Sequence, residues 1–120
     1  MNAAKQRAPP KIVPNLQGTE QGFLDQVLAL ARATGWLAHH CRPALSRGGR
    51  WATPIQGDAG FPDLVLVKGG RVLFWELKMG ENTLEVAQEA WRDALYVADA
   101  GYQTLTLADW DYIERTLQEG

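Results

Sequence analysis

Residues 60–80 read GFPDLVLVKGGRVLFWELKMG, and this stretch forms the centre of the expected fold. Two apolar runs rich in valine, leucine and aromatic residues flank the pair Gly69-Gly70. A Gly-Gly pair in this setting predicts two antiparallel strands joined by a two-residue turn. With Lys68 opposite Arg71, the predicted register of the hairpin is defined along its whole length.

The predicted register brings two carboxylates together, because it places Asp63 directly opposite Glu76. Opposed residues share a face of the sheet and have Cβ atoms about 5 Å apart. Two like charges at that distance repel each other, so we interpret the pair as ligands of a divalent cation. Oxygen ligands suit Mg²⁺ or Mn²⁺. Lys78 lies two residues beyond Glu76 on the same face, within reach of whatever the metal binds.

These residues resemble a nuclease signature. Pro62-Asp63 followed, after a hairpin, by Glu76-Leu77-Lys78 is similar to the PD-(D/E)xK motif. The fuller set of GFPDL (60–64), ELK (76–78) and the later Gln88 resembles the VRR-NUC nucleases, which occur in phages and in repair proteins. The resemblance covers about residues 19–113. It implies metal-dependent hydrolysis of DNA phosphodiester bonds.

The resemblance also implies roles for individual residues. Asp63, Glu76 and the backbone carbonyl of Leu77 would hold Mg²⁺ or Mn²⁺. Lys78 would position the attacking water or stabilise the charge on the phosphate. Gln88 would lie near that water or the metal.

A helix is predicted from Thr19, as N-cap, to about Ala33, before Gly35. Glu20 falls within the apolar stripe of this helix, and an acidic side chain at such a position requires a physical reason. One reason is a further contact with the metal, and the first-helix acid of the resembling family sits here. The other is an exposed first-turn carboxylate facing the helix dipole. The apolar stripe consists of Phe23, Val27, Leu30 and Ala31.

A second helix is predicted from Thr83, as N-cap, to about Ala98. Gln88 lies inside its apolar stripe, and a buried amide needs partners. Those partners are either the predicted site or nearby backbone groups. The stripe consists of Leu84, Ala87, Trp91, Leu95 and Ala98.

The other predicted elements are a first strand at 36–42, a strand at 102–107 and a short helix capped by Asp109. A strand–helix–strand step favours parallel pairing within one sheet. The chain is therefore predicted to be α/β, a mixed β-sheet flanked by helices in the order α-β-β-β-α-β-α, similar to the restriction-endonuclease-like core. Trp110, Ile113 and Leu117 are expected to point inward.

The long segment at 43–59 places arginines beside an aromatic residue, which suits phosphate pairing with base stacking. A solvated loop with Trp51 at the edge of the core is the alternative. The predicted DNA-contacting residues are Arg42, Arg47, Arg50, Trp51 and Arg92.

The chain of 120 residues fits one domain, 19–120, preceded by a flexible basic arm at 1–18. The net charge is −2, but 57–120 is acidic and 1–56 is basic. This asymmetry fits a phosphate-binding surface beside a carboxylate cluster, or simply uneven surface charge. The single cysteine excludes an intramolecular disulfide, and His39, His40 and Cys41 are too few ligands for a zinc site.

The preferred function is a structure-selective endonuclease that acts on Holliday-junction-like or other branched DNA. Two symmetric cuts favour a homodimer, for which Trp51, Trp110 and Tyr112 supply surplus aromatic surface. No apolar run is long enough to cross a membrane, so a cytoplasmic protein is expected, with a phage gene acting in its host as one origin. The alternative function is a catalytically silent nuclease-fold module that only binds DNA or a partner protein.

Overall fold

The computed structural model describes residues 19–40, 44–45, 51–52 and 56–120. The predicted arm at 1–18 lies outside this part of the chain. The observed order differs from the predicted one by an additional small hairpin, β2–β3, within the segment expected to be a loop. The elements are α1 Glu20–Ala33, β1 Leu37–His39, β2 Ala44–Leu45, β3 Trp51–Ala52, β4 Leu64–Lys68, β5 Arg71–Leu77, α2 Val86–Val97, β6 Tyr102–Leu105, the 3₁₀ turn Leu107–Asp109 and α3 Trp110–Glu119.

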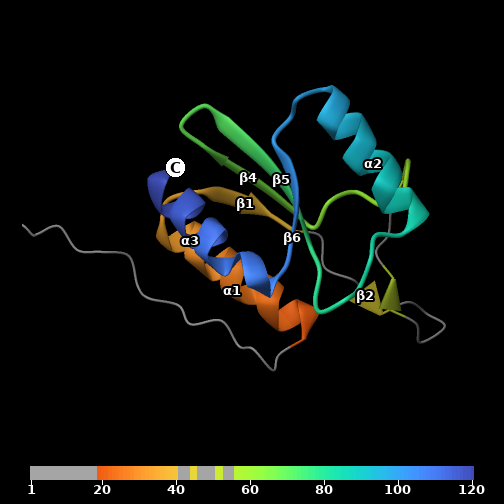
Figure 1. The fold of residues 1–120 in the computed structure, drawn as a ribbon, viewed down its shortest axis with the longest axis horizontal. Coiled ribbons are helices and arrows are strands. Elements are labelled where there is room, and N and C mark those ends of the chain that lie inside the picture. Colours follow the sequence, from red (N-terminus) through yellow and green to blue (C-terminus); the bar gives the residue numbers. More distant parts are fainter. Residues whose placement is uncertain (1–18, 41–43, 46–50, 53–55) are drawn as a thin grey trace, which may run out of the picture.

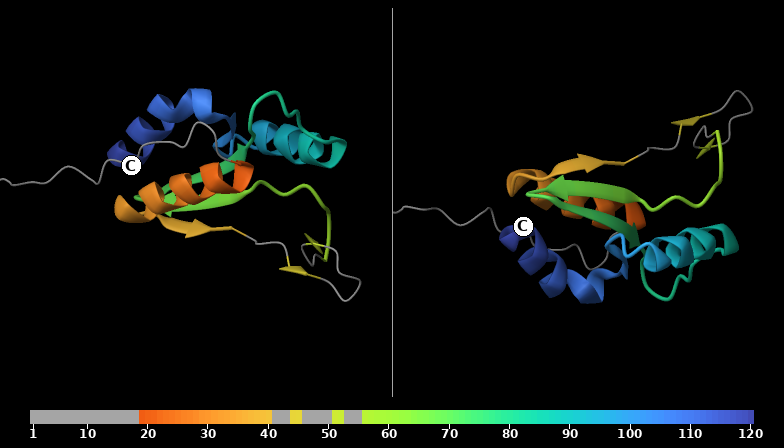
Figure 2. Two further views of the ribbon diagram at one scale, coloured as in Figure 1. Left: turned by 90° about the horizontal axis from the view of Figure 1, so that it is seen from below. Right: turned by 90° about the horizontal axis from the view of Figure 1, so that it is seen from above.

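Four strands form the main sheet, in the order β1-β4-β5-β6. The β1–β4 and β4–β5 pairs are antiparallel, whereas β5 and β6 are parallel. Helices α1 and α3 lie side by side on one face, and α2 lies on the other side near β6 (Figures 1 and 2). The predicted α/β class, with a mixed sheet flanked by helices, is confirmed. No helix in the described part of the chain is long and apolar enough to cross a membrane.

The predicted hairpin register is confirmed, because Lys68 pairs with Arg71 and Leu64 pairs with Trp75. Gly69 and Gly70 have φ angles of 57° and 80°. Positive φ at both central residues is the requirement of a type I′ turn, whose twist matches that of the strands. The turn therefore fixes which residues of β4 and β5 face each other, including those at the far end of the hairpin.

The main core lies between the sheet and the helices α1 and α3. The N-cap prediction for α1 is confirmed, because Thr19 Oγ1 accepts the Gly22 N–H at 3.1 Å. The indole N–H of Trp36 donates to the Leu117 carbonyl at 2.9 Å and ties the start of β1 to α3. Trp110 is only 8% exposed, so it belongs to this core and is no surplus surface residue. Other core residues are Phe23, Val27, Leu30, Leu64, Leu66, Trp75, Leu77, Ile113 and Leu117.

The prediction for α2 was wrong in two respects. The helix begins at Val86 with Glu85 as N-cap, not at Thr83, and none of its residues is buried. The cap moves because the Gln88 side-chain oxygen accepts the Glu85 N–H at 2.8 Å. The apolar stripe is shallow because α2 sits at the margin of the sheet, where Trp91 is only half-buried.

The segment before β4 is held tightly against α2. Gly60 has a φ of 94°, and a Cβ at this position would lie 2.5 Å from the backbone carbon and oxygen of Ala87. Phe61 stands edge-to-face with Trp91 at a centroid distance of 4.9 Å and with Phe74 at 6.1 Å. The close backbone approach and the aromatic packing together place Asp63 opposite the first turn of α2.

We expect Gly60→Ala to lower the free energy of unfolding by at least about 2 kcal/mol, because it adds a steric clash to the cost of positive φ. Gly57→Ala is the matched control, since Gly57 has a φ of 114° but open space around its Cβ position. It should lose only about 1 kcal/mol. Denaturant unfolding measures both values. Equal losses in the two variants would show that the approach to α2 is not tight.

Candidate functional site

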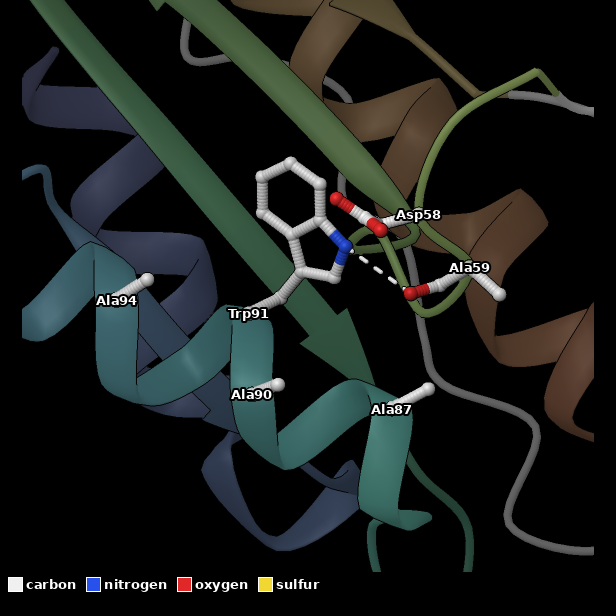
Figure 3. A pocket seen from close by; sticks show the side chains of 6 residues that line it. All are labelled: Asp58, Ala59, Ala87, Ala90, Trp91 and Ala94. Atoms are coloured by element: carbon white, nitrogen blue, oxygen red, sulfur yellow. Dashed lines mark hydrogen bonds between the residues drawn. The ribbon is translucent and has the colours of Figure 1, made fainter.

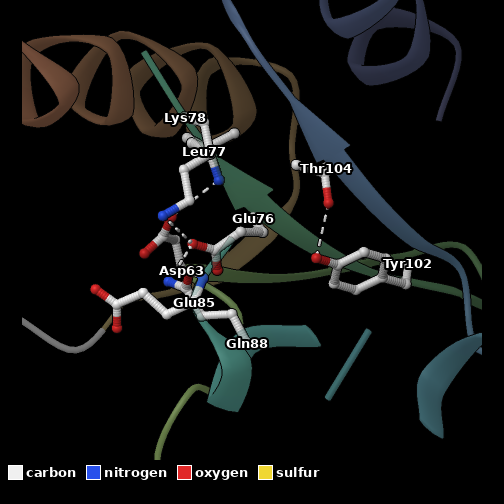
Figure 4. Close-up of polar contacts among 8 residues, drawn as sticks. All are labelled: Asp63, Glu76, Leu77, Lys78, Glu85, Gln88, Tyr102 and Thr104. Atoms are coloured by element: carbon white, nitrogen blue, oxygen red, sulfur yellow. Dashed lines mark hydrogen bonds and ion pairs between the residues drawn. The ribbon is translucent and has the colours of Figure 1, made fainter. Parts of the chain in front are cut away.

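Two carboxylates meet at the end of the hairpin, as the predicted register requires. Glu76 lies near the end of β5 and is 2% exposed. Asp63 precedes β4, and its Oδ2 accepts the backbone N–H of Leu77 at 2.8 Å (Figure 4). The Asp63 side chain therefore replaces a missing ladder bond at the point where β4 has not yet begun. This bond holds the Asp63 carboxylate at Leu77, the residue that follows Glu76 on β5.

Three groups surround the Glu76 carboxylate. The Gln88 Nε2 donates to its Oε2 at 2.9 Å, and the Lys78 Nζ lies 3.7 Å from the same oxygen. Burial, followed by the negative charge of Asp63, raises the pKa of Glu76 to about 8, although Lys78 acts in the opposite direction. Burial and the nearby Asp63 carboxylate therefore favour the protonated form of Glu76 in the metal-free protein.

The raised pKa of Glu76 predicts a pH dependence of stability. A carboxyl group with a pKa of about 8 in the folded state and 4.5 in the unfolded state binds its proton more tightly when folded. Its stabilising contribution is complete below about pH 4.5 and is lost as the pH rises to about 8, on the order of a few kcal/mol.

We therefore expect Glu76→Gln to be more stable than the wild type at high pH, with a gap that closes as the pH falls below 8. Denaturant unfolding of the metal-free proteins from pH 5 to 9 measures this gap. Glu85→Gln, which removes a nearby exposed carboxylate, should leave the wild-type pH dependence in place. A constant difference between Glu76→Gln and the wild type would contradict the assignment.

Gln88 combines both roles that its sequence position suggested. Its Oε1 accepts the Glu85 N–H at 2.8 Å, while its Nε2 donates to Glu76. The bond to the backbone fixes the orientation of the amide, so that its nitrogen must face the carboxylate. Gln88 thus belongs both to the capping box at the start of α2 and to the surroundings of Glu76.

Backbone groups and β6 complete the surroundings. In an extended strand, the N–H and C=O of one residue point to the same side. Since the Leu77 N–H points to Asp63, the Leu77 carbonyl points toward that side as well. The next residue, Lys78, donates its N–H to Leu105 on β6 at 2.9 Å. Behind the site, the Tyr102 hydroxyl bonds Thr104 Oγ1 at 2.8 Å (Figure 4).

The structure does not bring every predicted residue together. Glu20 is exposed on the first turn of α1, so its expected burial was wrong; the described contacts do not join it to Asp63 or Glu76. The side chain is exposed because burial of the stripe begins only at Phe23, one turn later. A metal contact by Glu20 stays a prediction.

The predicted DNA contacts are mostly untested. Arg42, Arg47 and Arg50 lie outside the described residues, and so does the side chain of Trp51. The Arg92 Nε donates to Asp93 Oδ1 at 2.8 Å, and this bond is the largest cause of the raised pKa of Arg92. Contact of Arg92 with phosphate stays a prediction.

His40 is a residue of the site to which the sequence assigned no role. Its Nδ1 lies 2.9 Å from the Asp63 carbonyl oxygen. A carbonyl only accepts, so Nδ1 carries the proton. The imidazole holds the Asp63 backbone where β1 and β4 separate, and its Nε2 is buried without a hydrogen-bond partner among the described residues. No pattern in the sequence indicates this contact, because it depends on the β1–β4 register.

Two cavities adjoin this region. One, of about 300 Å³, extends from Asp63 and Gln88 past Phe61 to His40 and is partly enclosed. The other, of about 390 Å³, lies over the alanine-rich face of α2 and contains neither Asp63 nor Glu76 (Figure 3). In the second cavity the Trp91 indole donates to the Ala59 carbonyl at 3.1 Å. Of these two cavities, the first borders Asp63 and Gln88, the partner of Glu76.

Within residues 19–40 and 56–120, no group of three or more His, Cys, Asp or Glu side chains is arranged to hold a metal ion. The candidate donors are therefore two carboxylates and a backbone carbonyl. In comparisons with known proteins, no family model, no curated protein and no solved structure matches this chain.

Proposed function

We propose that this chain is a Mg²⁺- or Mn²⁺-dependent endonuclease that hydrolyses DNA phosphodiester bonds on a restriction-endonuclease-like core. One observation carries most weight: the buried Glu76 faces Asp63 while Lys78 lies 3.7 Å from it. A purely structural role gives no reason to bury Glu76 and Lys78 beside the half-buried Asp63. Burial and then the negative charge of Asp63 raise the pKa of Glu76, and a divalent cation between the carboxylates would offset both effects by stabilising the charged form.

The donor set fits such a cation. Mg²⁺ is typically held by one or two carboxylates, keeps several waters and also binds substrate phosphates. Asp63, Glu76 and the Leu77 carbonyl offer only oxygen, which suits Mg²⁺ and Mn²⁺ and disfavours zinc. When bound, the metal supplies an activated water and neutralises charge on the phosphate.

The protein's own residues have separable tasks in this scheme. Asp63 is immobilised by the Leu77 N–H, so its free oxygen keeps a fixed direction. Lys78 is placed to orient the attacking water or to stabilise negative charge on the phosphate. Gln88 holds the Glu76 carboxylate in one orientation.

We further propose that the enzyme is selective for branched DNA and acts as a homodimer. Two symmetric cuts require two sites, which a two-fold dimer of a small chain provides. Of the three aromatic residues predicted for this interface, Tyr112 is the one whose side chain is described and exposed, at 37%.

A panel of labelled DNA substrates tests the proposed function. It contains duplex, nicked, flap, single-stranded and four-way-junction DNA, each with Mg²⁺, with Mn²⁺ and with EDTA. We expect cleavage of branched DNA with either metal and none with EDTA. Binding without cleavage under every condition would support the silent DNA-binding module instead.

Gln88→Ala should lower the cleavage rate by about 10- to 100-fold, because Glu76 loses the donor that orients it. It should also destabilise the fold by about 1–3 kcal/mol, since the Glu85 N–H and Glu76 lose a partner. Gln88→Glu is a useful comparison, because it keeps the acceptor for Glu85 and replaces the donor with a third acid. Retention of full activity in both variants would assign Gln88 to capping alone.

A further inference from the structure

We propose that the cavity beside Asp63 and Gln88 binds one unpaired nucleobase of the substrate, with a preference for bases that carry an exocyclic amino group. This inference rests on the proposed function and names a feature of its substrate. The cavity has a volume of about 300 Å³, at the lower end for ligand sites. That size suits a single planar group next to the scissile phosphate.

The wall of the cavity contains an aromatic surface that is both exposed and rigid. Phe61 is 44% exposed, although its ring is fixed by two edge-to-face contacts with Phe74 and Trp91. Its backbone is fixed as well, by Gly60 against α2 on one side and by the buried Pro62 on the other. A rigid exposed ring is suited to stacking, because no conformational freedom is lost on binding.

Negative charge at the cavity favours binding of a base over binding of a phosphate. The carboxylates of Asp58 and Glu85 line the cavity and are exposed, and the described residues offer neither of them an ion pair. Carboxylates repel phosphate but accept hydrogen bonds from amino groups such as cytosine N4. Thymine has no amino group, so it should be the poorest occupant.

The position of the cavity links base binding to the proposed chemistry. Asp63 and Gln88 belong both to its lining and to the carboxylate site. A base can enter only when it is unpaired, which costs least at branch points, frayed ends and single strands. Occupation of the cavity would therefore favour cleavage next to unpaired nucleotides.

Binding of short single-stranded homopolymers in EDTA tests the inference without requiring cleavage. We expect oligo(dC) and oligo(dA) to bind about tenfold more tightly than oligo(dT). Phe61→Ala should weaken binding of oligo(dC) by about tenfold or more. Tyr96→Ala, which removes an exposed ring near the far end of α2 and outside the cavity, should bind like the wild type. A single 2-aminopurine in the oligo(dC) should lose fluorescence on binding, since it stacks in the cavity.

A second variant keeps the test decisive if Phe61→Ala fails to fold. Asp58→Asn changes an exposed side chain and should reduce the preference for oligo(dC) over oligo(dT) toward equality. Equal wild-type affinity for oligo(dT) and oligo(dC), or wild-type binding in Phe61→Ala, would overturn the inference. The same holds if only the free mononucleotide binds. These outcomes are independent of the proposed function. A nuclease without the base site would still cleave DNA with metal. Conversely, the base site could bind DNA in a chain that never cleaves it.

Discussion

Asp63→Asn and Glu76→Gln should each lower the rate of Mg²⁺-dependent DNA cleavage by at least about 1000-fold, because each removes a negatively charged ligand worth several kcal/mol of transition-state stabilisation. Both changes keep the size of the side chain. Asparagine also keeps an oxygen that can accept the Leu77 N–H, which Asp63→Ala would leave without its 2.8 Å partner. Single-turnover cleavage of the best substrate in the panel measures the effect.

The same variants separate a catalytic defect from a folding defect. Removing one of two facing carboxylates relieves their repulsion, so the metal-free variants should be as stable as the wild type or more stable at pH 8 and above. Glu81→Gln, which changes an exposed carboxylate in the turn after β5, is the control for loss of an acid nearby and should cleave normally. Wild-type cleavage by either variant, or a clear loss of stability in both, would contradict a metal site at these residues.

Lys78→Met should lower cleavage by about 100- to 1000-fold, similar to the loss of a single donor that stabilises transition-state charge. Methionine keeps much of the aliphatic stem, which matters because Lys78 is only 9% exposed. The half-buried Lys68, at the other end of the hairpin, provides the control Lys68→Met. That variant should retain cleavage within a factor of a few once it is shown to be folded.

Metal affinity distinguishes the role of Lys78 from that of the carboxylates. Lys78→Met should bind Mn²⁺ at least as tightly as the wild type, since a competing positive charge 3.7 Å from Glu76 is gone. Weaker Mn²⁺ binding together with lost cleavage would mean that Lys78 mainly maintains the geometry of the carboxylates.

The hairpin and its carboxylates were predictable because their information is local. Gly69-Gly70 determines the turn, and strict alternation along the strands determines the faces. The opposition of Asp63 and Glu76 then follows from counting residues. Gln88 was predictable for a different reason, namely that an amide inside an apolar stripe requires a partner.

Features that depend on contacts between distant elements were not predictable. The start of α2 depends on the Gln88–Glu85 bond, and its shallow packing depends on where the helix meets the sheet edge. The contact of Gly60 with Ala87 and that of His40 with Asp63 require the tertiary arrangement. Glu20 is likewise exposed because the first turn of α1 extends past the core. The helical period of the sequence does not show where the core ends.

Electron paramagnetic resonance during a titration with Mn²⁺ tests whether Asp63 and Glu76 hold a metal ion, because free and bound Mn²⁺ give different signals. The wild type and Lys78→Met should bind Mn²⁺, whereas Asp63→Asn and Glu76→Gln should bind it at least about tenfold more weakly. A loss of about tenfold in metal affinity is already the lower end for changing a residue that only supports a metal ligand. Of the proteins that bind Mn²⁺, the wild type should cleave DNA at the full rate and Lys78→Met far more slowly. Equal Mn²⁺ binding by the wild type and both carboxylate variants, or no binding by any of them, would contradict a metal site at Asp63 and Glu76.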